Sequence, residues 1–146
     1  MIKAVTLGEE IVIVTKNKIG LLADITSILV DYGINIEAVN GYETGDTATI
    51  MLITNANLSI ISELRKAQYK TLKEAEVIIV ELENKPGALK TVTTELKVND
   101  IDIKHLYITS CSRGGSSKMV LHTSDNEKAM ALLAQHIRPG EEDSSA

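Results

Sequence analysis

The strongest constraint on the fold is an internal repeat, in which two stretches of the chain share one residue pattern. Residues 16–29 read KNKIGLLADITSIL, and residues 83–96 read ENKPGALKTVTTEL. Both contain Asn-Lys-x-Gly, followed by apolar residues every three or four positions. Asn17 and Asn84 are 67 residues apart, as are the two glycines of the motif. A repeat of this kind in a short chain predicts two copies of one structural unit.

Each copy is expected to have the element order β-α-β-β-α. An apolar strand leads into the repeated motif and an amphipathic helix, near residues 20–32 and 87–98. An Ile-x-Ile strand, a glycine-containing turn and another strand follow, and a second helix closes each copy. In the C-terminal copy, Ser124 and Glu127 have the spacing of a capping box for this second helix.

A fourth strand would complete each copy as a ferredoxin-like βαββαβ unit. In the N-terminal copy, an extended segment near residues 70–72 supplies this strand. The C-terminal copy has only an acidic tail after its last helix, so we expect residues 2–6 to complete its sheet. The predicted fold class is α+β, with antiparallel sheets and helices on one face of each. Its two domains are residues 1–70 and 71–138, followed by a flexible tail at residues 139–146.

The ends of the first helix in each copy also match. Gly33 is expected to end the helix of the N-terminal copy in a left-handed conformation. In the C-terminal copy Asp100 occupies the corresponding position, and Asp also tolerates a turn conformation.

Composition argues against several classes of function. Hydrophobic residues make up 44% of the 146 residues, and Phe and Trp are absent, so the core must consist of Ile, Val and Leu. The net charge of −5 offers no basic surface for phosphates, and we expect no direct nucleic-acid binding. No apolar run approaches the roughly 20 residues of a membrane-spanning helix, so no membrane association is expected. The single cysteine, Cys111, excludes an intrachain disulfide, and the expected location is cytoplasmic.

No residue pattern indicates catalysis, a metal or a cofactor. His105, His122 and His136 lack the spacing of metal ligands, and no pair of acids is placed for acid–base chemistry. Gly114-Gly115 is not followed by Gly-Lys-Ser/Thr and is interpreted as a hairpin turn. The chain is therefore not expected to be an enzyme, and no cofactor is expected.

The repeated motif resembles that of the ACT domain. The C-terminal copy has Asn-Lys-Pro-Gly-Ala-Leu, then a helix and Ile-Asp-Ile; the N-terminal copy has Asn-Lys-Ile-Gly-Leu-Leu and Gly-Ile-Asn-Ile. Together the copies cover the chain except for about the last eight residues. The resemblance implies a βαββαβ fold that binds small effectors, most often amino acids, at interfaces between ACT units. A homodimer or higher homo-oligomer is the expected assembly.

The resemblance also implies a ligand site in each copy. In the family, the Asn before Pro-Gly and the Asn after the helix contact the ligand. An ordinary turn or capping role for the first Asn is the alternative. The N–H groups at a helix N-terminus can in addition hold a carboxylate. The candidate binding residues are Asn17, Gly20, Leu21 and Asn35 in the N-terminal copy, and Asn84, Pro86, Gly87, Ala88 and Asp102 in the C-terminal copy.

The sequence favours the C-terminal copy as the ligand-binding site. Pro86 presets φ for the first turn of the helix, where the other copy has Ile19. We expect the helix to begin at Pro86, with free N–H groups on Gly87 and Ala88. A Gly87→Val substitution should block the ligand with only modest strain. Asp102, in place of the family's Asn, favours a ligand ammonium over a carboxylate.

Three functions remain open. The leading hypothesis is a small-molecule-sensing regulatory protein with tandem ACT domains, which binds an amino acid and signals to a partner enzyme or regulator. The alternative is a regulatory subunit of an amino-acid biosynthetic enzyme. The third is a small ferredoxin-like enzyme such as an acylphosphatase. Such an enzyme needs an Arg near a strand–helix junction, where this chain has Lys16, Lys18 and Lys85.

Overall fold

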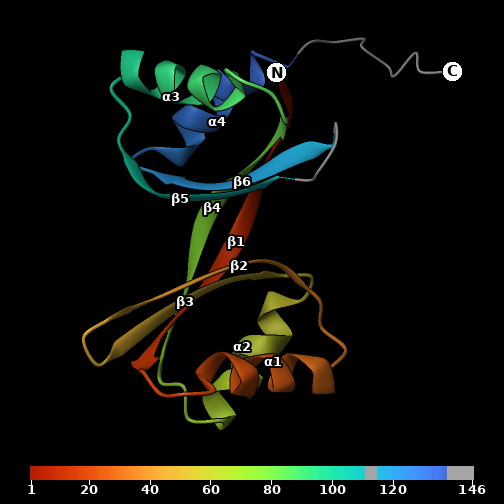
Figure 1. The fold of residues 1–146 in the computed structure, drawn as a ribbon, viewed down its shortest axis with the longest axis vertical. Helices are drawn as coiled ribbons and strands as arrows, with labels where there is room; N and C mark the ends of the chain where they lie inside the picture. The colour runs from red at the N-terminus through yellow and green to blue at the C-terminus, as the bar shows by residue number, and fades with distance from the viewer. Residues whose placement is uncertain (111–114, 138–146) are drawn as a thin grey trace, which may run out of the picture. The chain divides into compact units, whose positions relative to one another are not determined.

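The computed structural model describes residues 1–110 and 115–137; Cys111, Gly114 and the predicted acidic tail lie outside these ranges. Hydrogen bonds link the strands in the order β2-β3-β1-β4-β6-β5. The predictions of an α+β fold and of antiparallel strands are therefore confirmed, but one six-stranded sheet replaces the two separate sheets that we expected (Figure 1). The elements are β1 (Ile2–Lys16), α1 (Leu21–Asp31), β2 (Ile36–Thr44), β3 (Thr47–Thr54), α2 (Asn57–Lys66), β4 (Thr71–Glu83), α3 (Ala88–Val98), β5 (Ile103–Ser110), β6 (Ser116–Thr123) and α4 (Asn126–Ala134).

The chain divides into two compact units. One consists of Glu9–Ala75, and the other of Met1–Gly8 together with Glu76–Ala146. We name them the Asn17 unit and the Asn84 unit after the repeated asparagine that each contains. Both boundaries fall inside strands, so β1 and β4 each contribute residues to both units.

Continuous long strands replace the separate short strands that we expected. β1 runs through from Ile2 to Lys16, and β4 from Thr71 to Glu83. Residues 2–6 and the segment near residues 70–72, which we expect from the sequence as strands of their own, are continuous with the apolar strands that follow them. Neither stretch contains a proline, so backbone N–H donors are retained along its length and the extended conformation can continue.

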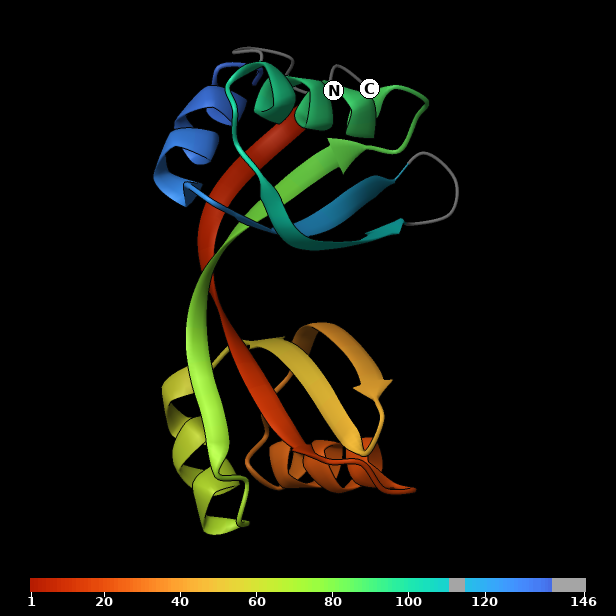
Figure 2. The same cartoon turned by 90° about the vertical axis from the view of Figure 1, so that its left-hand side faces the viewer.

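In the Asn17 unit, β1 and β2 pair antiparallel with β3. Helices α1 and α2 lie on one face of these strands (Figure 2). Ile13 and Gly41 both pair with Ile50, one on each side of β3. The buried core between sheet and helices consists of Ile11, Ile13, Leu21, Ile25, Leu29, Ala48, Ile50, Leu52, Ile60, Leu64 and Tyr69.

In the Asn84 unit, β4 and β5 pair antiparallel with β6, and α3 and α4 pack on one face (Figure 2). The start of β1 belongs to this unit. The Glu83 N–H donates to the Met1 carbonyl at 2.9 Å, and Ile2 forms a parallel bridge with Ile137. The Ile2 side chain is only 3% exposed and packs in this unit's core.

A second repeated motif, which the sequence analysis missed, ties each second helix to the sheet. The Thr54 N–H and hydroxyl both donate to Asn57 Oδ1, at 3.2 and 2.7 Å, and Asn57 Nδ2 donates to the Glu9 carbonyl at 2.8 Å. Thr123 and Asn126 repeat the arrangement, with Asn126 Nδ2 donating to the Glu76 carbonyl at 2.8 Å. Each Asn thus joins the start of a helix to a central strand.

The expected capping box at the start of α4 is wrong. Asp125 is the N-cap, and its side chain accepts a hydrogen bond from the Lys128 N–H at 3.0 Å. Ser124 lies one residue too early, and its hydroxyl accepts from the Asp102 N–H at 3.0 Å instead. The helix therefore begins one residue later than the spacing suggested.

Candidate functional site

The repeated motif forms the same turn in both units. Gly20 and Gly87 are the N-caps of α1 and α3, and both adopt left-handed conformations with φ of 83° and 90°. The first helical residues are therefore Leu21 and Ala88, and the expectation that the second helix begins at Pro86 is wrong.

The first helical N–H group of each helix is already engaged. The Leu21 N–H donates to the Lys18 carbonyl at 3.3 Å, and the Ala88 N–H donates to the Lys85 carbonyl at 3.3 Å. The prediction of a free N–H on Ala88 is therefore wrong, because the turn closes on it. No side chain caps either helix, so the next two N–H groups of the first turn are the ones available to a ligand.

Two further expectations about this turn need correction. The turns of the two units match closely although one has Ile19 where the other has Pro86, so proline gives the C-terminal copy no geometric advantage. Substituting Gly87 with Val would cost more than modest strain, because β-branched residues are strongly disfavoured at a φ of 90°.

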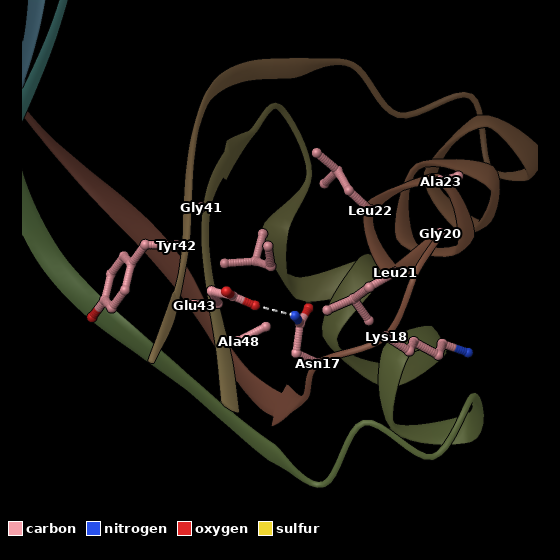
Figure 3. Close-up of a pocket in the computed structure, with 11 residues that line it drawn as sticks. Asn17, Lys18, Gly20, Leu21, Leu22, Ala23, Gly41, Tyr42, Glu43 and Ala48 are labelled. Atoms are coloured by element: carbon pink, nitrogen blue, oxygen red, sulfur yellow. Dashed lines mark hydrogen bonds between the residues drawn. The ribbon is translucent and has the colours of Figure 1, made fainter. Parts of the chain in front are cut away.

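A pocket of about 420 Å³ opens beside the turn of the Asn17 unit (Figure 3). It lies between the start of α1 and the ends of strands β2 and β3. Leu22 and Ala23, whose backbone N–H groups follow the engaged one, are part of its wall. We call it the Asn17 pocket; its lining residues are Asn17, Lys18, Gly20, Leu21, Leu22, Ala23, Gly41, Tyr42, Glu43, Ala48 and Ile50.

Asn17 and Glu43 are polar side chains of the pocket wall that point towards each other (Figure 3). Asn17 Nδ2 donates a hydrogen bond to the Glu43 carboxylate, and the Asn17 N–H donates to the Asp46 carbonyl at 2.6 Å. Asn17 thus does not cap α1. Its backbone is held by the β2–β3 hairpin, and its side chain lies at the pocket wall.

Lys18 is held away from the pocket by an ion pair. Its ammonium lies 2.9 Å from Asp24, and hydrogen bonding to that carboxylate raises the pKa of Lys18. Figure 3 shows the Lys18 side chain extending away from Asn17 and Glu43. Its positive charge is therefore directed to Asp24.

The structure does not bring all candidate site residues together. Asn17, Gly20 and Leu21 line one pocket, but Asn35 lies outside its wall and its N–H donates to Asn55 Oδ1 at 3.2 Å. Asp102 lies 3.1 Å from Lys104 Nζ. A role for Asn35 or Asp102 in contacting a ligand remains a prediction.

The Asn84 unit has a different arrangement beside its turn. A smaller pocket of about 300 Å³ there includes Gly87 but lies along α3, towards Glu95 and His136. The Met1 side chain covers the turn: its methyl carbon lies 3.5 Å from where a Cβ on Gly87 would be, and its sulfur is 3.4 Å from the Thr91 hydroxyl.

Edge-strand residues also distinguish the two units. Gly41 pairs with Ile50 in the Asn17 unit, whereas Ile108 pairs with Met119 at the corresponding place in the Asn84 unit. A Cβ on Gly41 would lie only 3.0 Å from Ile50 Cδ1, so the glycine keeps this part of the pocket open. Gly41 and Glu43 are not among the site residues predicted from the sequence, because only the pairing of β2 with β3 places them opposite Ile50 and Ala48.

Within the described residues, no three His, Cys, Asp or Glu side chains gather in a way that could hold a metal ion. None of the helices in the described ranges is long and apolar enough to cross a membrane.

Comparisons with known proteins identify the class of fold. Residues 10–66, which include the whole Asn17 pocket, match the family model described as the ACT domain. A comparison of the sequence with curated proteins gives no match.

Solved structures that share the fold include the following three. Protein BT0572 from Bacteroides thetaiotaomicron has a TM-score of 0.82 and 21% identity, over 90% of this chain and 89% of that one. The ligand-free regulatory subunit of aspartate kinase from Thermus thermophilus has a TM-score of 0.64 and 12% identity, over 94% and 99% of the chains. Aspartokinase III from E. coli, in complex with lysine and aspartate, has a TM-score of 0.51 and 16% identity, over 93% of this chain and 33% of that one.

Proposed function

We propose that this chain is a small-molecule-sensing regulatory protein built from two ACT domains, which binds an α-amino acid in the Asn17 pocket. The family match over residues 10–66 supports this for the Asn17 unit. For the Asn84 unit the support is the repeated motif, the repeated order of helices and strands, and the repeated Thr-Asn hydrogen bonds.

The observation that carries the proposal is the polarity of the Asn17 pocket. One side has the start of α1, where the Leu22 and Ala23 N–H groups and the helix dipole favour a carboxylate. The other side has the Glu43 carboxylate, which favours an ammonium. An α-amino acid carries both groups on one carbon, and its charges complement this pocket.

The Asn17 unit is the better site, in contrast to the preference drawn from the sequence. Gly41 leaves the wall open where the Asn84 unit has Ile108, and Met1 lies over Gly87 at the other turn. A single ligand per chain is the expected stoichiometry.

A second candidate is a regulatory subunit of an amino-acid biosynthetic enzyme. Its support is the fold shared with the regulatory subunit of aspartate kinase from Thermus thermophilus, over nearly the full length of both chains. Purifying the chain from its own cells under mild conditions separates the two: a subunit brings a catalytic chain with it in fixed proportion, whereas a free-standing sensor does not.

The third function, acyl phosphate hydrolysis, has less support. Lys18 is the one basic residue in the part of the Asn17 pocket lining that the structure describes, and it is paired with Asp24. A direct assay of acyl phosphate hydrolysis by the purified chain tests this function.

The proposed function is tested by thermal unfolding in the presence of each of the twenty amino acids. A ligand at about 100 times its Kd should stabilise the fold by about 2.7 kcal/mol. The Gly41→Ile variant copies the residue of the Asn84 unit and should lose this shift by filling the pocket. Gly41 is not in a left-handed conformation, so the substitution creates no backbone strain of that kind. If no amino acid shifts the unfolding temperature of the wild type, the proposed function is wrong.

A further inference from the structure

Among the described residues that line the Asn17 pocket, Glu43 is the one acidic side chain. It lies near the end of the edge strand β2 and pairs with Ala48. Figure 3 shows its carboxylate turned towards Asn17, between the strands and the start of α1.

No cation among the described residues of the pocket wall is paired with Glu43. The hydrogen-bond donor that reaches its carboxylate is Asn17 Nδ2, a neutral amide. Lys18, the one basic residue of the wall, is 2.9 Å from Asp24 and extends away from Glu43. A ligand in this pocket therefore meets a negative charge that is available to a cationic group.

Apart from Asn17, the wall around Glu43 is largely apolar. Ala48 and Ile50 are 3% and 6% exposed, Leu21 is 5% exposed, and Leu22 forms the outer part. An aliphatic ligand side chain placed against these residues would contribute favourable binding free energy, roughly 25 cal/mol for each Å² of apolar surface buried. A ligand carboxylate at the same place would lose its hydration and be repelled by Glu43.

We propose that Glu43 determines the ligand class of the Asn17 pocket: it binds the ammonium of an amino acid with an uncharged aliphatic side chain and disfavours acidic amino acids. This inference rests on the proposed function. The Asn84 unit has Ser110 at the corresponding position, paired with Ser117, and so lacks the charge that this recognition requires.

Isothermal titration calorimetry with two probes isolates the role of the carboxylate. L-Leucine carries the ammonium, and 4-methylpentanoate has the same carboxylate and aliphatic body without it. The wild type should bind L-leucine at least tenfold more tightly than 4-methylpentanoate, as expected for a charge-assisted hydrogen bond. The Glu43→Gln variant should lose about tenfold in L-leucine affinity and little affinity for 4-methylpentanoate, so that the preference largely disappears.

Glu37→Gln is the matched control, because it removes the same charge from β2 at a residue outside the pocket wall. It should bind both probes as the wild type does. Unchanged L-leucine affinity in Glu43→Gln, or tighter binding of L-aspartate than L-leucine by the wild type, would overturn the inference while leaving amino-acid binding intact. Absence of binding by all twenty amino acids would instead overturn the proposed function, and this inference with it.

Discussion

At the scale of single residues, two asparagine side chains with several hydrogen-bond partners each connect the start of a helix to a strand. Asn57 and Asn126 each accept two hydrogen bonds from a threonine and donate one to a strand carbonyl. Both are partly buried, so removing either side chain leaves several polar groups without their partner. Such losses typically cost 1–3 kcal/mol for a buried group.

We therefore expect Asn57→Ala to lower the free energy of unfolding of the Asn17 unit by about 1–3 kcal/mol, measured by urea denaturation. Asn57→Asp is the informative companion, since it keeps the acceptor for Thr54 and loses the donor to the Glu9 carbonyl. Its cost should be intermediate. An Asn57→Ala protein as stable as the wild type would show that the network contributes nothing.

The carboxyl groups of Glu9 and Glu74 interact directly with each other. Desolvation raises the pKa of Glu74, and hydrogen bonding and charge repulsion from Glu9 raise it further. A raised pKa means that the folded state binds the proton more tightly than the unfolded state. Glu74 therefore contributes stability below the ordinary pKa of 4.5, and this stability is lost as the pH rises through the folded pKa of Glu74.

Glu74→Gln should accordingly raise the unfolding temperature at pH 7, where it removes the repulsion. This difference in unfolding temperature between the variant and the wild type should shrink as the pH falls. It should be absent below about pH 4.5, because the wild-type carboxyl is then also neutral. Thermal scans of both proteins between pH 3.5 and 8, with Glu37→Gln as a charge control, check this. A pH-independent difference would contradict the assignment.

At the scale of elements, helix positions follow from the sequence better than strand lengths do. The repeated glycines mark the starts of α1 and α3, and Gly33 and Asp100 lie just past their ends with φ of 65° and 59°. The start and end of a helix depend on the backbone preferences of a few neighbouring residues, so both can be predicted from a short stretch of sequence. The continuous strands β1 and β4 depend on partners far along the chain, which a local pattern does not contain.

Asp100 offers a test of this helix-end interpretation. A non-glycine residue with positive φ is strained, and Asp100 is exposed, so Asp100→Gly should stabilise the Asn84 unit by about 0.5–1 kcal/mol. Asp100→Ala should do the opposite, because Ala has no side chain that eases the left-handed conformation. Denaturant unfolding of the three proteins should give the order Gly, Asp, Ala from most to least stable; the reverse order would refute the explanation.

At the scale of the whole molecule, the start of the chain belongs with residues distant in sequence. Met1–Gly8 groups with Glu76–Ala146, and Ile2 packs in the core of the Asn84 unit. The sequence indicated this because the C-terminal copy lacked a final strand. The Asn17 pocket was less predictable: the motif located Asn17 and Gly20, but Gly41 and Glu43 reach the pocket only through strand pairing.

Ile2→Ala should lower the stability of the Asn84 unit by about 2–4 kcal/mol, since it leaves a cavity in a filled core. Leu7→Ala, at a 50% exposed residue of the same strand, is the control and should cost well under 1 kcal/mol. Hydrogen exchange should then show faster exchange in α3 and α4 for Ile2→Ala. Unchanged protection of these helices would contradict the assignment of Ile2 to their core.

The central claim, that an amino acid binds in the Asn17 pocket, is tested most directly by residue-resolved NMR. A ¹H–¹⁵N titration with the amino acid that gives the largest thermal shift reports on each backbone N–H. We predict the largest changes at Leu22 and Ala23, with further changes at Gly41 and Glu43. The corresponding Leu89 and Lys90 at the start of α3 should remain unchanged. Changes centred on Leu89 and Lys90, with Leu22 and Ala23 unaffected, would contradict it.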